Sequence, residues 1–177
     1  MRAVRRGFAV LGLTLATSFL LACSPKYDWR EVHGSNSPFS ATLPAKASEY
    51  TRPVQLGTLK TEMTMTAAQV DGATYAIGTA VMPDAKLAQE ALSLMKQALV
   101  ANIDGKIVRE QGEQKPYPYL HVEARGHQQL YGNSKKVLLL ARFVAHENRI
   151  YQVIAAGEEK PAMREAADTL FSSFKPN

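Results

Sequence analysis

The residues best suited to acid–base chemistry lie on one alternating segment, residues 119–125. In an extended strand, side chains two positions apart share a face, so His121 and Glu123 point the same way, flanked on that face by Tyr119 and Arg125. An imidazole beside a carboxylate is a combination that general acid–base catalysis uses. The exposed polar face of an amphipathic strand has the same composition, and we favour that structural interpretation.

Other patterns typical of catalysis or metal binding are absent from the sequence. It contains no G-x-S-x-G motif around a serine nucleophile and no glycine-rich phosphate loop. The chain has four histidines, which are His33, His121, His127 and His146. No two of them stand at the helical i, i+4 spacing, and Cys23 is the only cysteine. We therefore expect no enzyme, no cofactor and no metal site.

Arg142 is the one charged residue in the most apolar stretch of the chain, residues 137–145. An arginine in such a strand needs a partner or a place at the edge of the sheet. We expect a structural salt bridge at Arg142, in preference to contact with an anionic ligand or plain exposure to solvent.

The N-terminal segment has the pattern of an export signal. Arg2, Arg5 and Arg6 precede an uncharged apolar run over residues 8–21. This run of about 14 residues is shorter than the roughly 20 that a membrane-spanning helix needs. A cleaved signal peptide, residues 1–22, is therefore favoured over a permanent transmembrane helix.

The apolar run closes with Leu20-Leu21-Ala22-Cys23, which resembles the lipobox of bacterial lipoproteins. The resemblance implies cleavage after Ala22, a diacylglycerol thioether on Cys23 and acylation of the new amino group. An ordinary signal peptide with a chance cysteine is the weaker alternative. The residue after Cys23 is Ser24. An aspartate at this position would resemble an inner-membrane retention signal, so its absence favours the outer membrane over the inner membrane.

Removal of the signal leaves 155 residues, of which 23–26 form a short tether and 27–177 a single domain. A domain of this size buries roughly 70% of its unfolded surface, which is enough to fold without disulfides. The net charge of +5 falls to +2, because three arginines leave and 18 basic residues then face 16 acidic ones. No stripe of basic residues interleaved with aromatics supports nucleic-acid binding.

The clearest structural signal is a β-hairpin over residues 59–81. Two alternating segments, 59–70 and 73–81, flank Asp71-Gly72, a dipeptide that favours the positive φ values of a two-residue turn. The turn predicts the cross-strand pairs Met63–Ala80, Met65–Gly78, Thr66–Ile77 and Ala68–Tyr75. One face therefore sets methionines against small residues and leaves room for a helix.

The remaining elements follow from apolar spacing. One helix begins after Asp84 and ends at Gly105, and a second begins at Pro161 and runs to about residue 174. Further strands are predicted at 27–32, 39–43, 106–110, 119–125, 137–145 and 150–156, whereas residues 45–53 are expected to be irregular. The isolated glycines Gly126, Gly132 and Gly157 are interpreted as turn or strand-end residues. Trp29 is expected in the core, with the membrane interface as the alternative for Tyr27 and Trp29.

This order of elements predicts an α+β domain with a mainly antiparallel sheet and two helices packed on it. Over residues 29–174 the order resembles the PsbP-like α/β/α sandwich, in which one helix follows the long hairpin and another closes the chain. The segments F-x-x-x-L-P at 39–44 and LFSSF at 170–174 are also common in small exported bacterial proteins. The resemblance implies a non-catalytic accessory or binding protein.

We accordingly expect a membrane-anchored envelope lipoprotein that faces the periplasm and acts through contact with an envelope protein or the envelope itself. A carrier of a small apolar ligand is the first alternative, because Met63, Met65 and Met95 could line a deformable pocket. An enzyme that uses the His121/Glu123 face is the second alternative.

Overall fold

The computed structural model describes residues 26–35, 37–130 and 133–177. The predicted signal segment, the lipobox with Cys23, and Gly132 lie outside the described residues.

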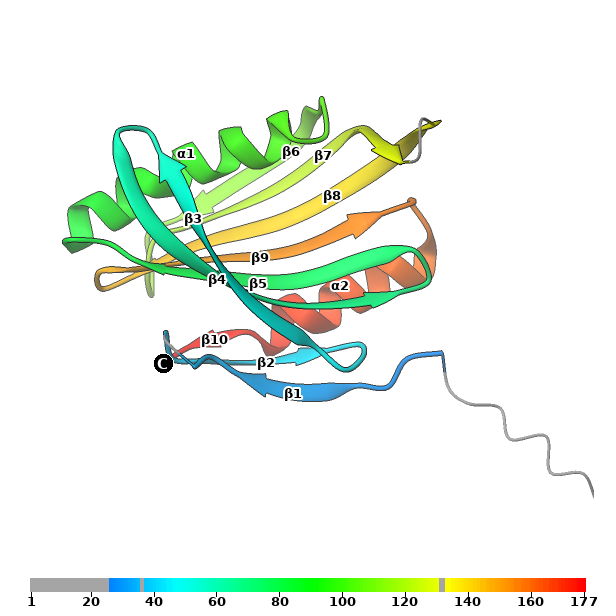
Figure 1. Ribbon diagram of the computed structural model, residues 1–177, viewed down its shortest axis with the longest axis horizontal. Helices are drawn as coiled ribbons and strands as arrows, with labels where there is room; N and C mark the ends of the chain where they lie inside the picture. Colours follow the sequence, from blue (N-terminus) through cyan, green and yellow to red (C-terminus); the bar gives the residue numbers. More distant parts are fainter. Residues whose placement is uncertain (1–25, 36, 131–132) are drawn as a thin grey trace, which may run out of the picture.

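A seven-stranded antiparallel sheet forms the centre of the domain (Figure 1). Its strands stand in the order β3-β4-β5-β9-β8-β7-β6. Their bounds are β3 Ser48–Leu56, β4 Leu59–Val70, β5 Ala73–Val81, β6 Lys106–Glu113, β7 Tyr119–Leu130, β8 Asn133–His146 and β9 Arg149–Gly157. Sequential hairpins build both halves of the sheet, and the β5–β9 pair joins the halves.

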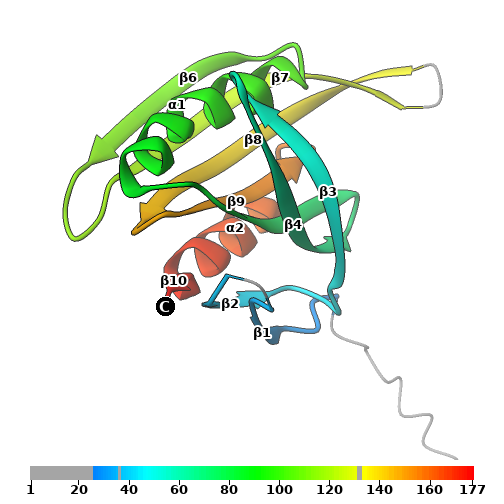
Figure 2. The same cartoon turned by 60° about the vertical axis from the view of Figure 1, so that its left-hand side comes forward.

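Two helices cover the sheet, one on each face (Figure 2). Helix α1 (Ala85–Ala101) follows the long hairpin, and α2 (Pro161–Ser173) follows β9. A small sheet of β1 (Arg30–His33), β2 (Phe39–Leu43) and β10 (Lys175–Pro176) packs on the α2 side. The predicted α+β class with two packed helices is confirmed, while the separate small sheet was not predicted.

Among the described residues, no helix is long and apolar enough to cross a membrane.

The sheet separates two apolar cores. Met63, Met65 and Met95 lie in the core beneath α1, together with small residues such as Ala88 and Ala91. The core beneath α2 is built around larger side chains, chiefly Phe39, Tyr75, Tyr151, Leu170 and Phe171. Strand β8 serves both cores, because its residues alternate between them.

The 59–81 hairpin is confirmed with its predicted strand bounds and register. Met65 pairs with Gly78, and the same register joins Thr66 to Ile77 and Ala68 to Tyr75. Asp71 and Gly72 have φ values of 54° and 75°, as a two-residue turn of this kind requires. Gly78 has a packing role, because a Cβ there would lie 2.6 Å from the Met65 sulfur.

The expectation of irregular chain at residues 45–53 is wrong, because β3 begins at Ser48. The strand lies at an edge of the sheet and is exposed along most of its length, so its sequence shows no apolar alternation. The strands β6, β7 and β8 also extend beyond their predicted ends into exposed polar residues. The first strand is later than expected and begins at Arg30.

The start of α1 is confirmed, since the Leu87 N–H donates to the Asp84 carboxylate at 2.8 Å. Its end differs from the prediction, because Asn102 is the C-cap and Asp104, with φ of 45°, takes the left-handed conformation. Gly105 is needed for packing instead, as a Cβ there would lie 2.8 Å from Ile103.

Two further expectations about single residues are wrong. Gly126 is neither a turn nor a strand end but lies within β7, where a Cβ would lie 2.2 Å from the carbonyl oxygen of Ile103. Trp29 is not a core residue, since 39% of it is exposed. It precedes β1, which lies at the edge of the small sheet and, within the described residues, pairs only with β2. Gly157 ends β9 as predicted.

Replacing Gly72 by valine is predicted to lower the free energy of unfolding by about 1 kcal/mol or more, because a β-branched residue resists positive φ. Among the described residues, no atom outside the turn lies within 4 Å of a Cβ at this position, so we expect the loss to come from the backbone. Urea denaturation measures the effect, with Gly72→Asn as the matched control, because asparagine tolerates the left-handed region. Equal stability of the valine variant and the wild type would contradict the assigned turn.

Candidate functional site

The polar face of β7 lies against α2. Strand β7 directs His121 and Glu123 toward the helix, and both side chains are half-buried. The His121 ring meets the Phe171 ring of α2 edge to face, with ring centroids 5.3 Å apart. The expectation that His121 and Glu123 lie on an exposed polar face is therefore wrong, because α2 packs over this part of β7 and partly buries both side chains.

The His121 imidazole has an environment that disfavours its charged form. Burial lowers the pKa of His121 from its ordinary value, and the charges of Arg142 and Arg109 lower it further. Its Nδ1 atom is buried and has no hydrogen-bond partner in the part of the chain that the structure describes. The surroundings of His121 therefore favour the neutral imidazole, and its ring packs against Phe171.

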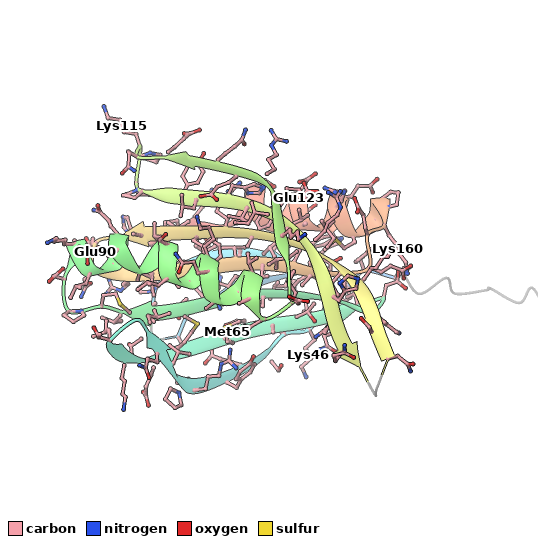
Figure 3. All side chains as sticks on the ribbon, turned by 90° about the horizontal axis from the view of Figure 1, so that it is seen from above. Lys46, Met65, Glu90, Lys115, Glu123 and Lys160 are labelled. Atoms are coloured by element: carbon pink, nitrogen blue, oxygen red, sulfur yellow. The ribbon has the colours of Figure 1, made fainter. Side chains whose placement is uncertain are left out.

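Glu123 belongs to a four-membered ion-pair network that joins β7, the β9–α2 loop and α2. Its carboxylate accepts from Arg164 of α2 at 2.8 Å and lies 3.1 Å from the Arg125 guanidinium. Glu159 in the loop contacts both arginines, with 3.0 Å to Arg125. Figure 3 labels Glu123 on β7 beside α2. The side chain of Glu123 is only 15% exposed, whereas those of its three partners are 35–48% exposed, so the network runs from the joint to the surface.

The network keeps both carboxylates ionised. The hydrogen bond from Arg164, reinforced by its charge and that of Arg125, holds the pKa of Glu123 below its ordinary value. The hydrogen bonds from Arg125 and Arg164 lower the pKa of Glu159 to about 2. Neither group can donate a proton near pH 7, and strong pairing makes each a poor base.

The expected salt bridge of Arg142 is wrong: within the described residues Arg142 has no carboxylate partner. Its Nη1 donates instead to the carbonyl oxygen of Phe171 at 3.0 Å. The guanidinium also lies over the rings of Phe171 and Tyr119, 5.3 and 5.7 Å from their centroids. Phe171 is in the last turn of α2, where carbonyls lack helical donors and the helix dipole favours a cation.

The structure thus brings together the polar residues that the sequence singled out, and their contacts hold α2 on the sheet. A depression of about 740 Å³ lies next to the network, bordered by Arg125, Glu159, Lys106 and His127 among others. Neither His121 nor Glu123 lines it. In the described part of the chain, no group of three His, Cys, Asp or Glu side chains is placed to hold a metal.

A second candidate site lies between α1 and the β3–β4 edge. An open depression of about 330 Å³ is lined by Met63, Met95 and Gln152, with Arg52 at its side. Gln152 is buried, and its amide Nε2 donates to the Met63 and Met65 sulfurs at 3.2 and 3.4 Å. Of the three methionines predicted to line a pocket, Met63 and Met95 line this depression and Met65 does not.

Sequence reasoning missed Gln152, although a signal was present. A lone glutamine in the apolar segment 150–156 must find hydrogen-bond partners once buried. Gly78 makes its position possible, because a Cβ at Gly78 would lie 2.7 Å from the Gln152 side chain.

Comparison with known proteins supports the fold and nothing more specific. No family model matches the chain, and no curated protein matches it in sequence. The chain is similar to the solution structure of cyanobacterial PsbP (CyanoP) from Synechocystis sp. PCC 6803, with a TM-score of 0.54 and 9% identity. The match covers 88% of this chain and 96% of that one. The domain thus has the PsbP-like fold that the order of its elements resembles.

Replacing Glu123 by glutamine is predicted to lower the free energy of unfolding at pH 7 by about 1–2 kcal/mol, because Arg164 loses a partly buried, charged partner. The pKa of Glu123 is lower in the folded than in the unfolded chain, so its stabilisation is full above the ordinary value of 4.5 and is lost as the pH falls through the folded value. The stability difference between wild type and variant therefore shrinks below pH 4.5.

Urea denaturation at neutral and acid pH measures this difference. Glu62→Gln is the matched control, because Glu62 is exposed on β4 and lies away from α2. A Glu123→Gln deficit that is the same at both pH values would contradict the assigned role of the network.

Proposed function

We propose that the protein is a non-catalytic lipoprotein of the bacterial cell envelope that acts by contacting another protein. Cys23 carries the lipid, the folded domain faces the periplasm, and the outer membrane is favoured because Ser24 follows the cysteine. The observation that carries the non-catalytic part is the use of Glu123, Arg125 and Arg142 to hold α2 on the sheet. An enzyme built on the His121/Glu123 face would have to break these contacts.

The surface that best fits a protein partner is the outer edge of β6. This strand lies at the edge of the sheet (Figure 2) and, among the described residues, pairs only with β7. It is exposed at every residue. Ile107 and Val108 are 40% and 50% exposed, which is unusual for aliphatic side chains side by side. Free backbone groups on such an edge pair readily with an extended segment of another chain, and the aliphatic side chains supply apolar contact.

The carrier function is a second candidate, because the depression beneath α1 has the chemistry that it needs. Met63 and Met95 provide flexible apolar walls, and the Gln152 amide provides one polar group able to orient a ligand. The volume of about 330 Å³ suits a small molecule.

Replacing Cys23 by serine is predicted to release the protein from the membrane, because serine cannot form the thioether to diacylglycerol. The variant should appear as an unprocessed precursor or a soluble product. Fractionation after a carbonate wash, followed by intact mass measurement, tests this outcome. If the variant still fractionates with membranes in the mature size, the lipid anchor is wrong.

Affinity capture of the lipidated protein from detergent-solubilised membranes is predicted to recover a specific envelope protein, and the double variant Ile107→Lys/Val108→Lys should lose it. The new charges oppose apolar contact at the edge without touching a core residue. Val81→Lys is the matched control, because Val81 is 47% exposed at the end of β5, away from β6.

The same captured material distinguishes the two functions. A small molecule that is retained by the β6 variant, with no specific protein partner, would support the carrier and overturn the proposed contact function. A partner that the β6 variant and the Val81 control bind equally would show that the contact surface is not β6.

A further inference from the structure

Trp29 is an exposed aromatic residue that the fold holds in place. Its ring stacks on the ring of Tyr27, with centroids 5.8 Å apart and planes inclined by 24°. Tyr27 is half-buried against the α2 core, and its hydroxyl donates to the carbonyl oxygen of Ala162 at 3.4 Å. The backbone between the two rings is fixed by the Asp28 N–H, which donates to the Pro44 carbonyl at 2.9 Å. Tyr27 therefore supports Trp29 from below and leaves its outer side open.

The aromatic pair lies at the end of the molecule where the N-terminal chain joins the domain. The β4–β5 turn and the start of α2 form this end (Figure 1). Lys26 pairs with Asp71 of the turn at 2.6 Å, and Lys160, labelled in Figure 3, lies 3.9 Å from the same carboxylate. Trp29 is six residues from Cys23 in sequence, which limits their separation to about 20 Å.

The charges around the pair are largely compensated. Lys26 is paired with Asp71, Arg30 with Asp28, and Lys160 with Glu158 at 3.0 Å. Attraction to anionic headgroups is therefore weak at this end. The feature of this end that could still interact with a membrane is the amphipathic indole ring of Trp29. Such rings are enriched where the acyl chains of a bilayer meet the headgroups.

We propose that Trp29, supported by Tyr27, rests in the interfacial layer of the membrane and sets the orientation of the domain on it. The inference rests on the proposed lipid anchor, since the anchor brings this end of the molecule within reach of the bilayer. In this orientation the β4–β5 turn faces the lipid, and the opposite end of the sheet points into the periplasm.

Intrinsic fluorescence tests the orientation directly, because Trp29 is the only tryptophan of the chain. The lipidated protein is reconstituted into phosphatidylcholine vesicles with either ordinary or bromine-labelled acyl chains, since bromine quenches an indole that it touches. Trp29 is expected to lose a large part of its emission in the labelled vesicles, because an interfacial ring lies within reach of the acyl chains. Adding anionic phosphatidylglycerol should leave this loss unchanged, because the local charges are paired.

The matched control carries Trp29→Phe together with Val81→Trp. Val81 is similarly exposed but lies at the other end of β5 from the turn, about 25–30 Å away. This tryptophan is expected to show no bromine quenching and to stay accessible to acrylamide.

Flotation of the vesicles separates the two claims. If the wild type does not float, the lipid anchor fails and the orientation fails with it. If it floats, and Trp29 is no more quenched than the tryptophan at position 81, the anchor stands and the orientation is overturned.

Discussion

The burial of the central strands on both faces is the constraint on which the rest of the structure depends. Strand β8 sends Leu139, Ala141 and Phe143 into one core and Leu138 and Leu140 into the other. Neither face can be left to water, so the sheet needs a cover on each side. The long hairpin leads directly into the first cover, α1, and β9 leads into the second, α2.

The two covers are attached by different chemistry. Helix α1 packs mainly across β8, β9 and β7, and its alanines share a core with Met63 and Met65 of β4. Gly78 leaves space in this core for Met65 and Gln152. Helix α2 adds polar contacts to its apolar stripe, through Arg164 and the carbonyl of Phe171. The polar residues of β7 that a catalytic hypothesis would use therefore help to hold α2 on the sheet. This is why we propose that the domain acts by contact and not by catalysis.

The sequence predicted correctly those parts of the fold whose conformation depends on neighbouring residues in the chain. The Asp71-Gly72 turn, its strands and the Asp84 cap depend on backbone conformation and side-chain reach within a few residues, and they were predicted correctly. Strand β3 was missed because an edge strand exposed on both faces leaves no periodic signal. The other wrong expectations concern residues whose environment depends on contacts with distant parts of the chain.

Arg142 is the clearest example at the candidate site. Its sequence context correctly indicated that it needs a partner, but that partner is a helix-terminal carbonyl and two aromatic rings. Nothing local to residues 137–145 specifies that the end of α2 lies above them. The pairing of Glu123 with Arg164 likewise depends on how α2 packs, 41 residues further along the chain. The choice of residues at the site was thus predictable from sequence, whereas their structural use was not.

The central claim is that the domain acts by contact through the edge strand β6. Photo-crosslinking in living cells tests it most directly, with a benzoyl-phenylalanine placed at Val108 and, for comparison, at Val81, which is exposed to a similar degree. We expect one discrete crosslinked envelope protein from position 108 and none from position 81. The absence of a specific crosslink at position 108, or an identical pattern at both positions, would contradict it.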